Sequence, residues 1–224
     1  MPELCVYALT SRQTLAKARR IRTRGVEGEP LQAVPIGRID AIVGRVRAIP
    51  KPTDSNLLRY DHVISALWRR TPALLPARFG TSARDSADLE DMVRGRERML
   101  RTRLLAVRHR AQMTIRIVAG DPAPPSPRLR RARATRKTGQ SGTHYLRSRQ
   151  REYAVPAFDP LRAAVRRWIR DERVEKHGRV ASIYHLVPRS SITRYTSAIE
   201  RTAREAGVRI IVSGPWPPYA FGDM

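Results

Sequence analysis

The sequence predicts an α+β protein built from two domains. Short runs of β-branched and other apolar residues alternate along the chain with longer segments whose apolar residues recur at helical spacing. Proline and glycine separate these segments, as expected for loops between compact elements. The 224 residues, of which 41% are hydrophobic, suffice for one large or two small cores and argue against wholesale disorder.

Residues 1–72 are predicted to form an N-terminal α+β domain with the element order β-α-β-β-α. The first strand is predicted at 4–9 because this segment is almost entirely apolar. A helix capped by Thr10 or Ser11 is predicted to follow and to reach about Ile21.

A pair of strands and a second helix complete this domain. The strands are predicted at 31–35 and 39–47, since apolar residues recur at alternate positions of the second segment. The helix is predicted over 56–70, where apolar residues recur at helical spacing, and Pro72 ends it.

Residues 73–224 are predicted to form the C-terminal domain. Its first strand is predicted at 73–79, and Pro76 restricts that strand to a sheet edge or a bulge. One long amphipathic helix is predicted over about 86–107, with an apolar stripe on one side and arginine on the other. A strand is predicted at 112–118.

The composition changes between residues 119 and 141. A proline-rich stretch at 121–127 is followed by a basic stretch at 128–137, and neither offers much apolar surface to bury. We therefore interpret 119–141 as a mobile excursion of the chain whose basic half can turn helical.

Ordered structure is expected again after Gly142. Helices are predicted over 144–154 and from Asp159, where a capping residue precedes a proline, to Gly178. The strand predicted at 180–187 carries apolar residues on both faces, so we expect it at the centre of a sheet.

A last helix and a last strand close the predicted domain. The helix is capped by Ser190 or Ser191 and ends at Gly207, and the strand is predicted as a buried run at 208–212. From residue 73 onward the order is therefore β-α-β, a helical insertion, and β-α-β. This order predicts a modified ferredoxin-like domain, a split βαβ fold with a helical insertion.

The segment at 214–221 is stiffened by three prolines and carries Trp216, Tyr219 and Phe221. Because proline has no amide proton, we expect the preceding strand to stop before Pro215. Two interpretations are open and compatible. The rings fold back onto the sheet and anchor the terminus, or they form a stiff docking surface for another protein.

The formal net charge of +24 predicts attraction to polyanions such as nucleic acid, acidic proteins and anionic surfaces. Polyanion-binding candidates come from the densest basic stretch: Arg128, Arg130, Arg131, Arg133, Arg136 and Lys137. The alternative is a solvated basic surface without a dedicated site. Nonspecific, salt-sensitive binding of nucleic acid is expected from the charge alone.

No set of catalytic or metal-binding residues stands out. The histidines and the single cysteine do not fall at metal-binding spacings, and the sequence contains neither a phosphate-binding loop nor a nucleophile elbow. His185 lies in the predicted central strand and is expected to be a hydrogen-bonded core residue. We predict a protein that is not an enzyme and uses no metal or cofactor.

Neither a membrane helix nor a secretory signal is predicted. No apolar run approaches the roughly 18–20 residues that a membrane helix needs. The N-terminus lacks a basic region followed by an apolar one. With one cysteine there is no internal disulfide, and Cys5 is expected to be a buried strand residue. These features fit a cytoplasmic protein.

Three segments carry a resemblance to a known family. They are LLPARFGT at 74–81, GTHYL at 142–146 and GPWPPYAF at 214–221, of which the last is the most specific. In this order they resemble the GvpF/GvpL family of gas vesicle proteins. The resemblance implies two α+β domains, the second of modified ferredoxin type, and a location in the cytoplasm and at the gas vesicle.

The resemblance also implies a function, that of a non-enzymatic accessory or minor structural protein of gas vesicle assembly. Such a protein contacts the main shell protein and other gas vesicle accessory proteins and needs no membrane. The candidate partner-binding residues on this chain are Trp216, Tyr219 and Phe221. The alternative is a basic nucleic-acid-binding module that uses the arginine-rich segment 128–137.

Overall fold

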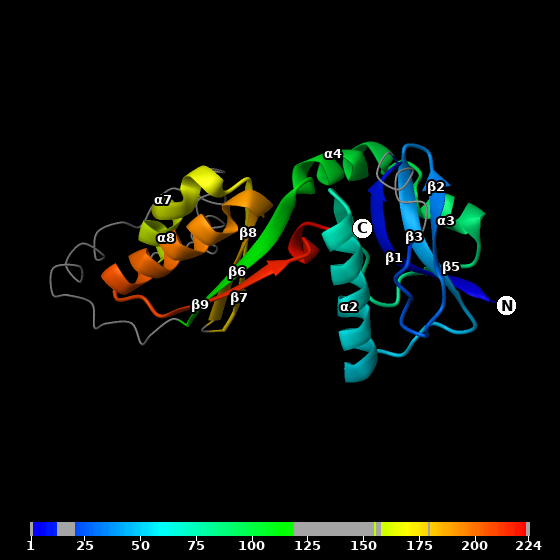
Figure 1. Cartoon of the computed structure of the whole chain (residues 1–224), viewed down its shortest axis with the longest axis horizontal. Coiled ribbons are helices and arrows are strands. Elements are labelled where there is room, and N and C mark those ends of the chain that lie inside the picture. The colour runs from blue at the N-terminus through cyan, green and yellow to red at the C-terminus, as the bar shows by residue number, and fades with distance from the viewer. Residues whose placement is uncertain (1, 13–20, 119–154, 156–157, 179, 223–224) are drawn as a thin grey trace, which may run out of the picture. The chain divides into compact units, whose positions relative to one another are not determined.

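The computed structural model describes residues 2–12, 21–118, 155, 158–178 and 180–222. These residues form helices and strands in a mixed arrangement (Figure 1). The chain divides into two compact units, each made of segments that are distant in sequence. The segments of unit 1 are Met1–Met113, Leu186–Ile192 and Gly214–Met224, and those of unit 2 are Thr114–His185 and Thr193–Ser213.

The sheet of unit 1 is organised around its first strand. β1 (Glu3–Ser11) pairs antiparallel with β3 (Ile39–Val46) on one side and with β4 (Leu74–Pro76) and β5 (Ser82–Ala83) on the other. β2 (Leu31–Ile36) pairs with the far edge of β3. The predicted strands at 4–9, 31–35 and 39–47 are confirmed. Residues 13–20 of the helix predicted after β1 lie outside the described residues.

Helix α2 (Asp54–Arg70) packs against this sheet, as the sequence predicts. The Thr53 hydroxyl accepts a hydrogen bond from the Asn56 amide and caps the first turn. One side of the helix, including Tyr60, Ile64 and Leu67, is buried in a core that contains residues of β1, β3 and β4. The helical spacing of apolar residues therefore placed this face correctly.

Two helices occupy the segment that was predicted as one. α3 (Ser86–Val93) and α4 (Glu97–Val107) are separated at Gly95, which has a φ of 77°. A glycine adopts this left-handed conformation without steric penalty, so the backbone turns there. The apolar stripe continues on both helices and is buried, which is why periodicity alone did not reveal the break.

The division between the two compact units does not coincide with the domain boundary predicted near Pro72. Strand β4 pairs with β1 through Ala8–Pro76 and Thr10–Leu74, so it completes the first sheet. The Thr10 hydroxyl also donates a hydrogen bond to the Ala73 carbonyl at 2.8 Å. β4 lies at an edge of that sheet, as Pro76 predicts. A strand's own pattern indicates how it is buried, but it does not specify which strand it pairs with.

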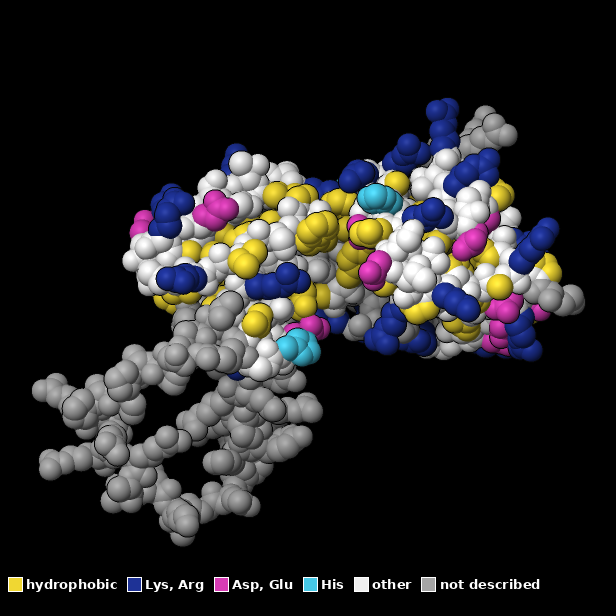
Figure 2. Space-filling model, turned by 90° about the horizontal axis from the view of Figure 1, so that it is seen from below, with side chains coloured by type: hydrophobic (Ala, Val, Ile, Leu, Met, Phe, Trp, Pro, Cys, Tyr) yellow, Lys and Arg dark blue, Asp and Glu magenta, His cyan; other side chains and the backbone are white. Residues whose placement is uncertain are grey.

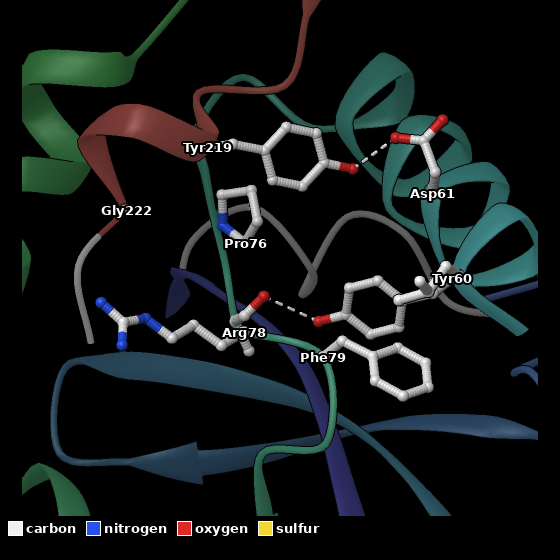
Figure 3. A pocket seen from close by; sticks show the side chains of 9 residues that line it. Tyr60, Asp61, Pro76, Arg78, Phe79, Tyr219 and Gly222 are labelled. Atoms are coloured by element: carbon white, nitrogen blue, oxygen red, sulfur yellow. Dashed lines mark hydrogen bonds between the residues drawn. The ribbon is translucent and has the colours of Figure 1, made fainter. Parts of the chain in front are cut away.

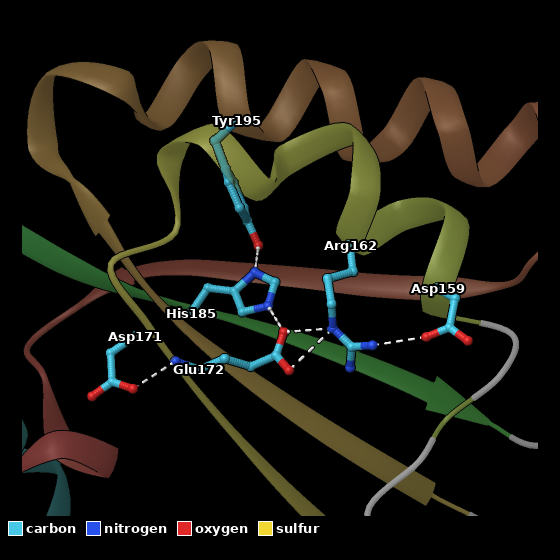
Figure 4. A network of polar contacts seen from close by, with 6 residues as sticks. All are labelled: Asp159, Arg162, Asp171, Glu172, His185 and Tyr195. Atoms are coloured by element: carbon cyan, nitrogen blue, oxygen red, sulfur yellow. Dashed lines mark hydrogen bonds and ion pairs between the residues drawn. The ribbon is translucent and has the colours of Figure 1, made fainter.

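The second sheet has the strand order β7-β8-β6-β9. Its strands are β6 (Arg110–Val118), β7 (Asp171–His177), β8 (Val180–Pro188) and β9 (Ile210–Trp216). Helices α7 (Asp159–Val165) and α8 (Ile192–Glu205) lie on the same face of this sheet (Figures 1 and 4). β8 is an interior strand buried on both faces, which confirms the prediction for 180–187.

The helix predicted from Asp159 to Gly178 is wrong beyond its first turns. α7 ends at Val165, a short 3-10 turn follows at Arg166–Trp168, and β7 then forms an edge of the second sheet. The sequence of β7 is DERVEKH, which lacks the apolar alternation of an ordinary strand. Charged residues suit an edge strand because they discourage pairing with other chains, and they also conceal the strand from pattern analysis.

The last strand also differs from its prediction. β9 runs through Pro215 to Trp216 instead of stopping before the proline, and it is not buried, since Ile211 is 60% exposed. It lies at the other edge of the second sheet, where a residue without an amide proton leaves no ladder bond broken. Within the described part of the chain, no helix has the length and apolar character needed to cross a membrane.

Candidate functional site

A pocket of about 380 Å³ opens on unit 1 (Figure 3). It is lined by three segments that are distant in sequence: Leu57, Tyr60 and Asp61 of α2, residues 76–79, and Tyr219 with Gly222. Residues 76–79 belong to LLPARFGT and Tyr219 belongs to GPWPPYAF, the motifs that the sequence singles out. The fold thus brings both motifs to one place on the molecule.

The C-terminal segment is anchored beside this pocket by burial and by a side-chain hydrogen bond. Phe221 is 3% exposed, and Pro217 and Pro218 are buried as well. The Ala220 amide donates to Gln112 Oε1 at 2.7 Å. Phe221 therefore packs in the interior, whereas Tyr219, the other tyrosine or phenylalanine of this segment, remains 36% exposed.

Tyr219 bridges the two walls of the pocket. Its hydroxyl donates a hydrogen bond to Asp61 Oδ1 at 2.7 Å, across 158 positions of sequence. Burial raises the pKa of the Tyr219 phenol, and the hydrogen bond to Asp61 raises it further. The phenol is therefore a permanent donor at neutral pH, and it orients one oxygen of the Asp61 carboxylate.

The floor of the pocket is a rigid aromatic cluster. The ring of Tyr60 stacks on Tyr7 at 5.4 Å and meets Phe79 edge-on at 5.3 Å. Its hydroxyl lies 2.8 Å from the Ala77 carbonyl and 3.2 Å from the Tyr7 carbonyl, both of which are acceptors. Burial raises the pKa of Tyr60, so its proton stays in place at neutral pH. The cluster fixes residues 77–79 relative to α2.

A buried carboxylate supports the cluster from behind. The Tyr7 hydroxyl donates to Glu29 Oε1 at 2.5 Å and accepts from the Val26 amide at 2.8 Å. Glu29 is 9% exposed and lies so close to Gly25 that a Cβ there would overlap the Glu29 carboxylate. The sequence indicated only that Glu29 lies in a loop, since a buried glutamate leaves no local pattern.

The remaining candidates from the sequence fall in two settings. Trp216 is at the end of β9 and is 41% exposed. The GTHYL motif at 142–146 lies outside the described residues, and so do Arg128, Arg130, Arg131, Arg133, Arg136 and Lys137. On the described surface, basic side chains are dispersed over the face seen in Figure 2. Asp61 was not singled out, because an aspartate in a helix is ordinary in sequence.

Unit 2 contains a polar network around the histidine of its central strand (Figure 4). His185 is fully buried; its Nδ1 lies 2.7 Å from the Tyr195 hydroxyl and its Nε2 lies 2.7 Å from Glu172 Oε2. Arg162 Nε donates to both oxygens of Glu172 at 3.0 and 3.1 Å, and its Nη1 donates to Asp159 at 2.7 Å. The predicted role of His185 as a hydrogen-bonded core residue is confirmed.

The protonation states in this network follow from burial and hydrogen bonding. Burial raises the pKa of Glu172, but hydrogen bonds from His185 and Arg162 outweigh it and lower the pKa to about 2. Burial lowers the pKa of His185 below its usual value, although the bond to Glu172 opposes this. A neutral His185 therefore donates from Nε2 to the carboxylate and accepts at Nδ1 from Tyr195.

The chemical capacity of these two sites differs. Tyr195 and His185 are both fully buried, whereas Glu172 and Arg162 are partly exposed, so the histidine end of this network is closed to solvent. Within the described part of the chain, no three or more histidine, cysteine, aspartate or glutamate residues gather to hold a metal ion. The pocket of unit 1 offers aromatic surface with one carboxylate, a combination suited to binding.

Comparison with known proteins gives one family and consistent relatives. The family model described as "Gas vesicle synthesis protein GvpL/GvpF" matches residues 4–223. The chain is similar to "Gas vesicle protein L2" of Halobacterium salinarum, with 25% identity over 252 residues that span 96% of this chain and 90% of that protein.

Solved structures show the same fold. The crystal structure of gas vesicle protein GvpF from Microcystis aeruginosa matches with a TM-score of 0.73 at 14% identity, covering 99% of each chain. GvpF from Anabaena sp. PCC7120 also matches with a TM-score of 0.73, at 13% identity, over 100% of this chain and 99% of that one. From the family match over nearly its whole length, this chain belongs to the GvpL/GvpF family of gas vesicle synthesis proteins.

Proposed function

We propose that this protein is a non-enzymatic accessory protein of gas vesicle assembly that binds the main shell protein and other gas vesicle proteins. One observation carries the proposal. The motifs LLPARFGT and GPWPPYAF, which are distant in sequence, line the same pocket of unit 1.

The chemistry of the exposed side chains supports a protein partner. Tyr219 is 36% exposed, Leu57 is 42% exposed, and both line the pocket. Trp216, in the same C-terminal motif, is 41% exposed. Large aromatic residues contribute most of the energy of many interfaces, because they bury much area with few rotatable bonds. The rigid cluster beneath Tyr219 lowers the entropy that binding must overcome.

The proposal includes a fold and a location. The element order β6-α7-β7-β8-α8-β9, with sheet order β7-β8-β6-β9, supports a modified ferredoxin-like domain that begins at β6. The family membership supports a place in the cytoplasm and at the gas vesicle.

Co-purification with the main gas vesicle shell protein tests this function. We expect the wild-type chain to capture the shell protein and the double variant Trp216→Ala with Tyr219→Ala to capture at least about tenfold less, as expected for loss of two aromatic interface residues. Trp168→Ala in unit 2 is the matched control, since it removes a half-buried ring from the other unit.

Circular dichroism and thermal unfolding establish that each variant is folded before capture is compared. Equal capture by wild type and the folded double variant would show that these two residues do not contribute to the interface. No capture by the wild-type chain would overturn the proposed partner.

A further inference from the structure

We propose that the pocket of unit 1 binds a cationic side chain, arginine or lysine, of the gas vesicle protein that this chain recognises. The inference rests on the proposed function, because it names the chemistry of the partner at the same site. It follows from the aromatic lining, from the charge of Asp61 and from the lack of an ion pair to Asp61 among the described residues.

The first support is the lining of the pocket. The rings of Tyr60, Phe79 and Tyr219 line it together with the Asp61 carboxylate (Figure 3). The faces of aromatic rings carry partial negative charge and attract a cation within about 6 Å of the ring centre. A carboxylate next to such rings adds a charge-assisted hydrogen-bond acceptor for an ammonium or guanidinium group.

The second support is that Asp61 has no cation of its own. The chain has 44 basic and 20 acidic residues, so an acidic side chain has many potential partners. Asp88, Asp159 and Glu172 each form an ion pair with an arginine. Within the described residues no ion pair involves Asp61, whose one hydrogen bond is that from Tyr219 to Oδ1.

The Tyr219 hydroxyl also determines which carboxylate oxygen of Asp61 is available to a cationic guest. Because Oδ1 accepts from the phenol at 2.7 Å, the carboxylate is held in one orientation and Oδ2 remains as an acceptor. This arrangement is prepared before binding, which reduces the entropy lost when a guest is ordered. A carboxylate held in one orientation inside a pocket discriminates between guest side chains better than a freely rotating carboxylate on the surface does.

One basic residue, Arg78, also lines the pocket. Its side chain extends away from Asp61 (Figure 3). If Arg78 dominated instead, the pocket would select an acidic guest, and this alternative is an outcome of the test below.

The test uses the full chain and three blocked hexapeptides of glycine, serine and leucine that differ in one central residue. That residue is arginine, its neutral analogue citrulline, or glutamate. Binding is followed by NMR through the amides of Ala220 and Gly222, which lie beside and in the pocket. We expect the arginine peptide to bind at least about fivefold more tightly than the citrulline peptide, equivalent to ~1 kcal/mol for an ion pair at a partly exposed site.

A charge variant and its matched control make the result specific. Asp61→Asn removes the charge but keeps an oxygen that accepts from Tyr219, and we expect it to abolish the preference for arginine over citrulline. Glu200→Gln, on the exposed side of α8, removes the same charge far along the chain and should leave the preference unchanged. Equal binding of the arginine and citrulline peptides, tighter binding of the glutamate peptide, or no binding at millimolar peptide would each overturn the inference.

Failure of this inference is distinguishable from failure of the proposed function. Capture of shell protein can depend on Trp216 and Tyr219 and yet be the same for wild type and Asp61→Asn. That result would support the proposed function and contradict the proposed cationic guest. Loss of capture in Asp61→Asn but not in Glu200→Gln would support both.

Discussion

The two units place the same kinds of side chain in different environments. In unit 1, the Tyr219 phenol and the Asp61 carboxylate meet at the rim of an open pocket, where Tyr219 is 36% exposed. In unit 2, the Tyr195 phenol and the Glu172 carboxylate are joined through His185, which is fully buried. A tyrosine and a carboxylate are therefore not a sign of function by themselves, and their exposure decides whether they recognise a partner or stabilise the fold.

The difference extends to how each carboxylate is balanced. Glu172 receives two hydrogen bonds from Arg162 and one from His185, which satisfies its charge within the unit. Asp61 receives one hydrogen bond, and its donor is the uncharged phenol of Tyr219. A charge that is fully paired contributes to the stability of its own domain, whereas an incompletely paired charge at a pocket is available for binding.

The largest effect is expected from the ring that joins α2 to the pocket floor. Tyr60→Ala removes the stack on Tyr7 and the edge contact to Phe79, and we expect it to lower the free energy of unfolding of unit 1 by about 3–5 kcal/mol. Tyr60→Phe keeps the ring and should cost about 1 kcal/mol for the lost hydroxyl bond to Ala77. Urea unfolding measures both. Similar losses for the two variants would show that the hydroxyl, not the ring, supports the pocket.

Acid should weaken unit 2 through its buried network. Below pH 6.5 the unfolded chain protonates His185 more readily than the folded chain, because burial lowers its pKa in the fold. Glu172 acts in the same direction at lower pH: its contribution is complete above about 4.5 and is lost as the pH falls toward its folded pKa of about 2. We expect acidification to reduce the stability of unit 2 by about 2 kcal/mol from Glu172 alone.

Hydrogen exchange of α8 amides against pH measures this effect, with α2 amides as the reference from unit 1. Glu172→Gln has no carboxylate to protonate, so this variant should show a shallower decline below pH 4.5 than the wild type. An unchanged decline in Glu172→Gln would mean that other groups cause the acid sensitivity.

The smallest effect is expected at the rim of the pocket. Tyr219→Phe removes one partly exposed hydrogen bond and keeps the ring, so it should reduce the local stability of the C-terminal segment by about 0.5–1 kcal/mol. Faster exchange of the amides at 220–222, with unchanged exchange in α8, is the expected result. If those amides do not change, the anchoring comes from Phe221 and Gln112 rather than from the bond to Asp61.

Local patterns in the sequence predict many of the helices and strands. Apolar spacing identified the buried face of α2, the central position of β8 and the core role of His185. It failed where the local signal was absent or misleading. The charged strand β7 resembled a helix continuation, and Gly95 interrupted a stripe that stayed buried on both sides. Local periodicity reports burial, because burial repeats with the geometry of the element.

Contacts between residues that are distant in sequence become visible only in the folded chain. The motifs at 74–81 and 214–221 were both visible in the sequence, but nothing in either indicates that Tyr219 bonds to Asp61 across 158 positions or that β4 pairs with β1. Strand pairing and side-chain contacts between distant segments depend on the packing of the whole unit. The sequence therefore identified the chain's family and its candidate residues, while the fold brought Asp61 to the pocket for which we propose a cationic guest.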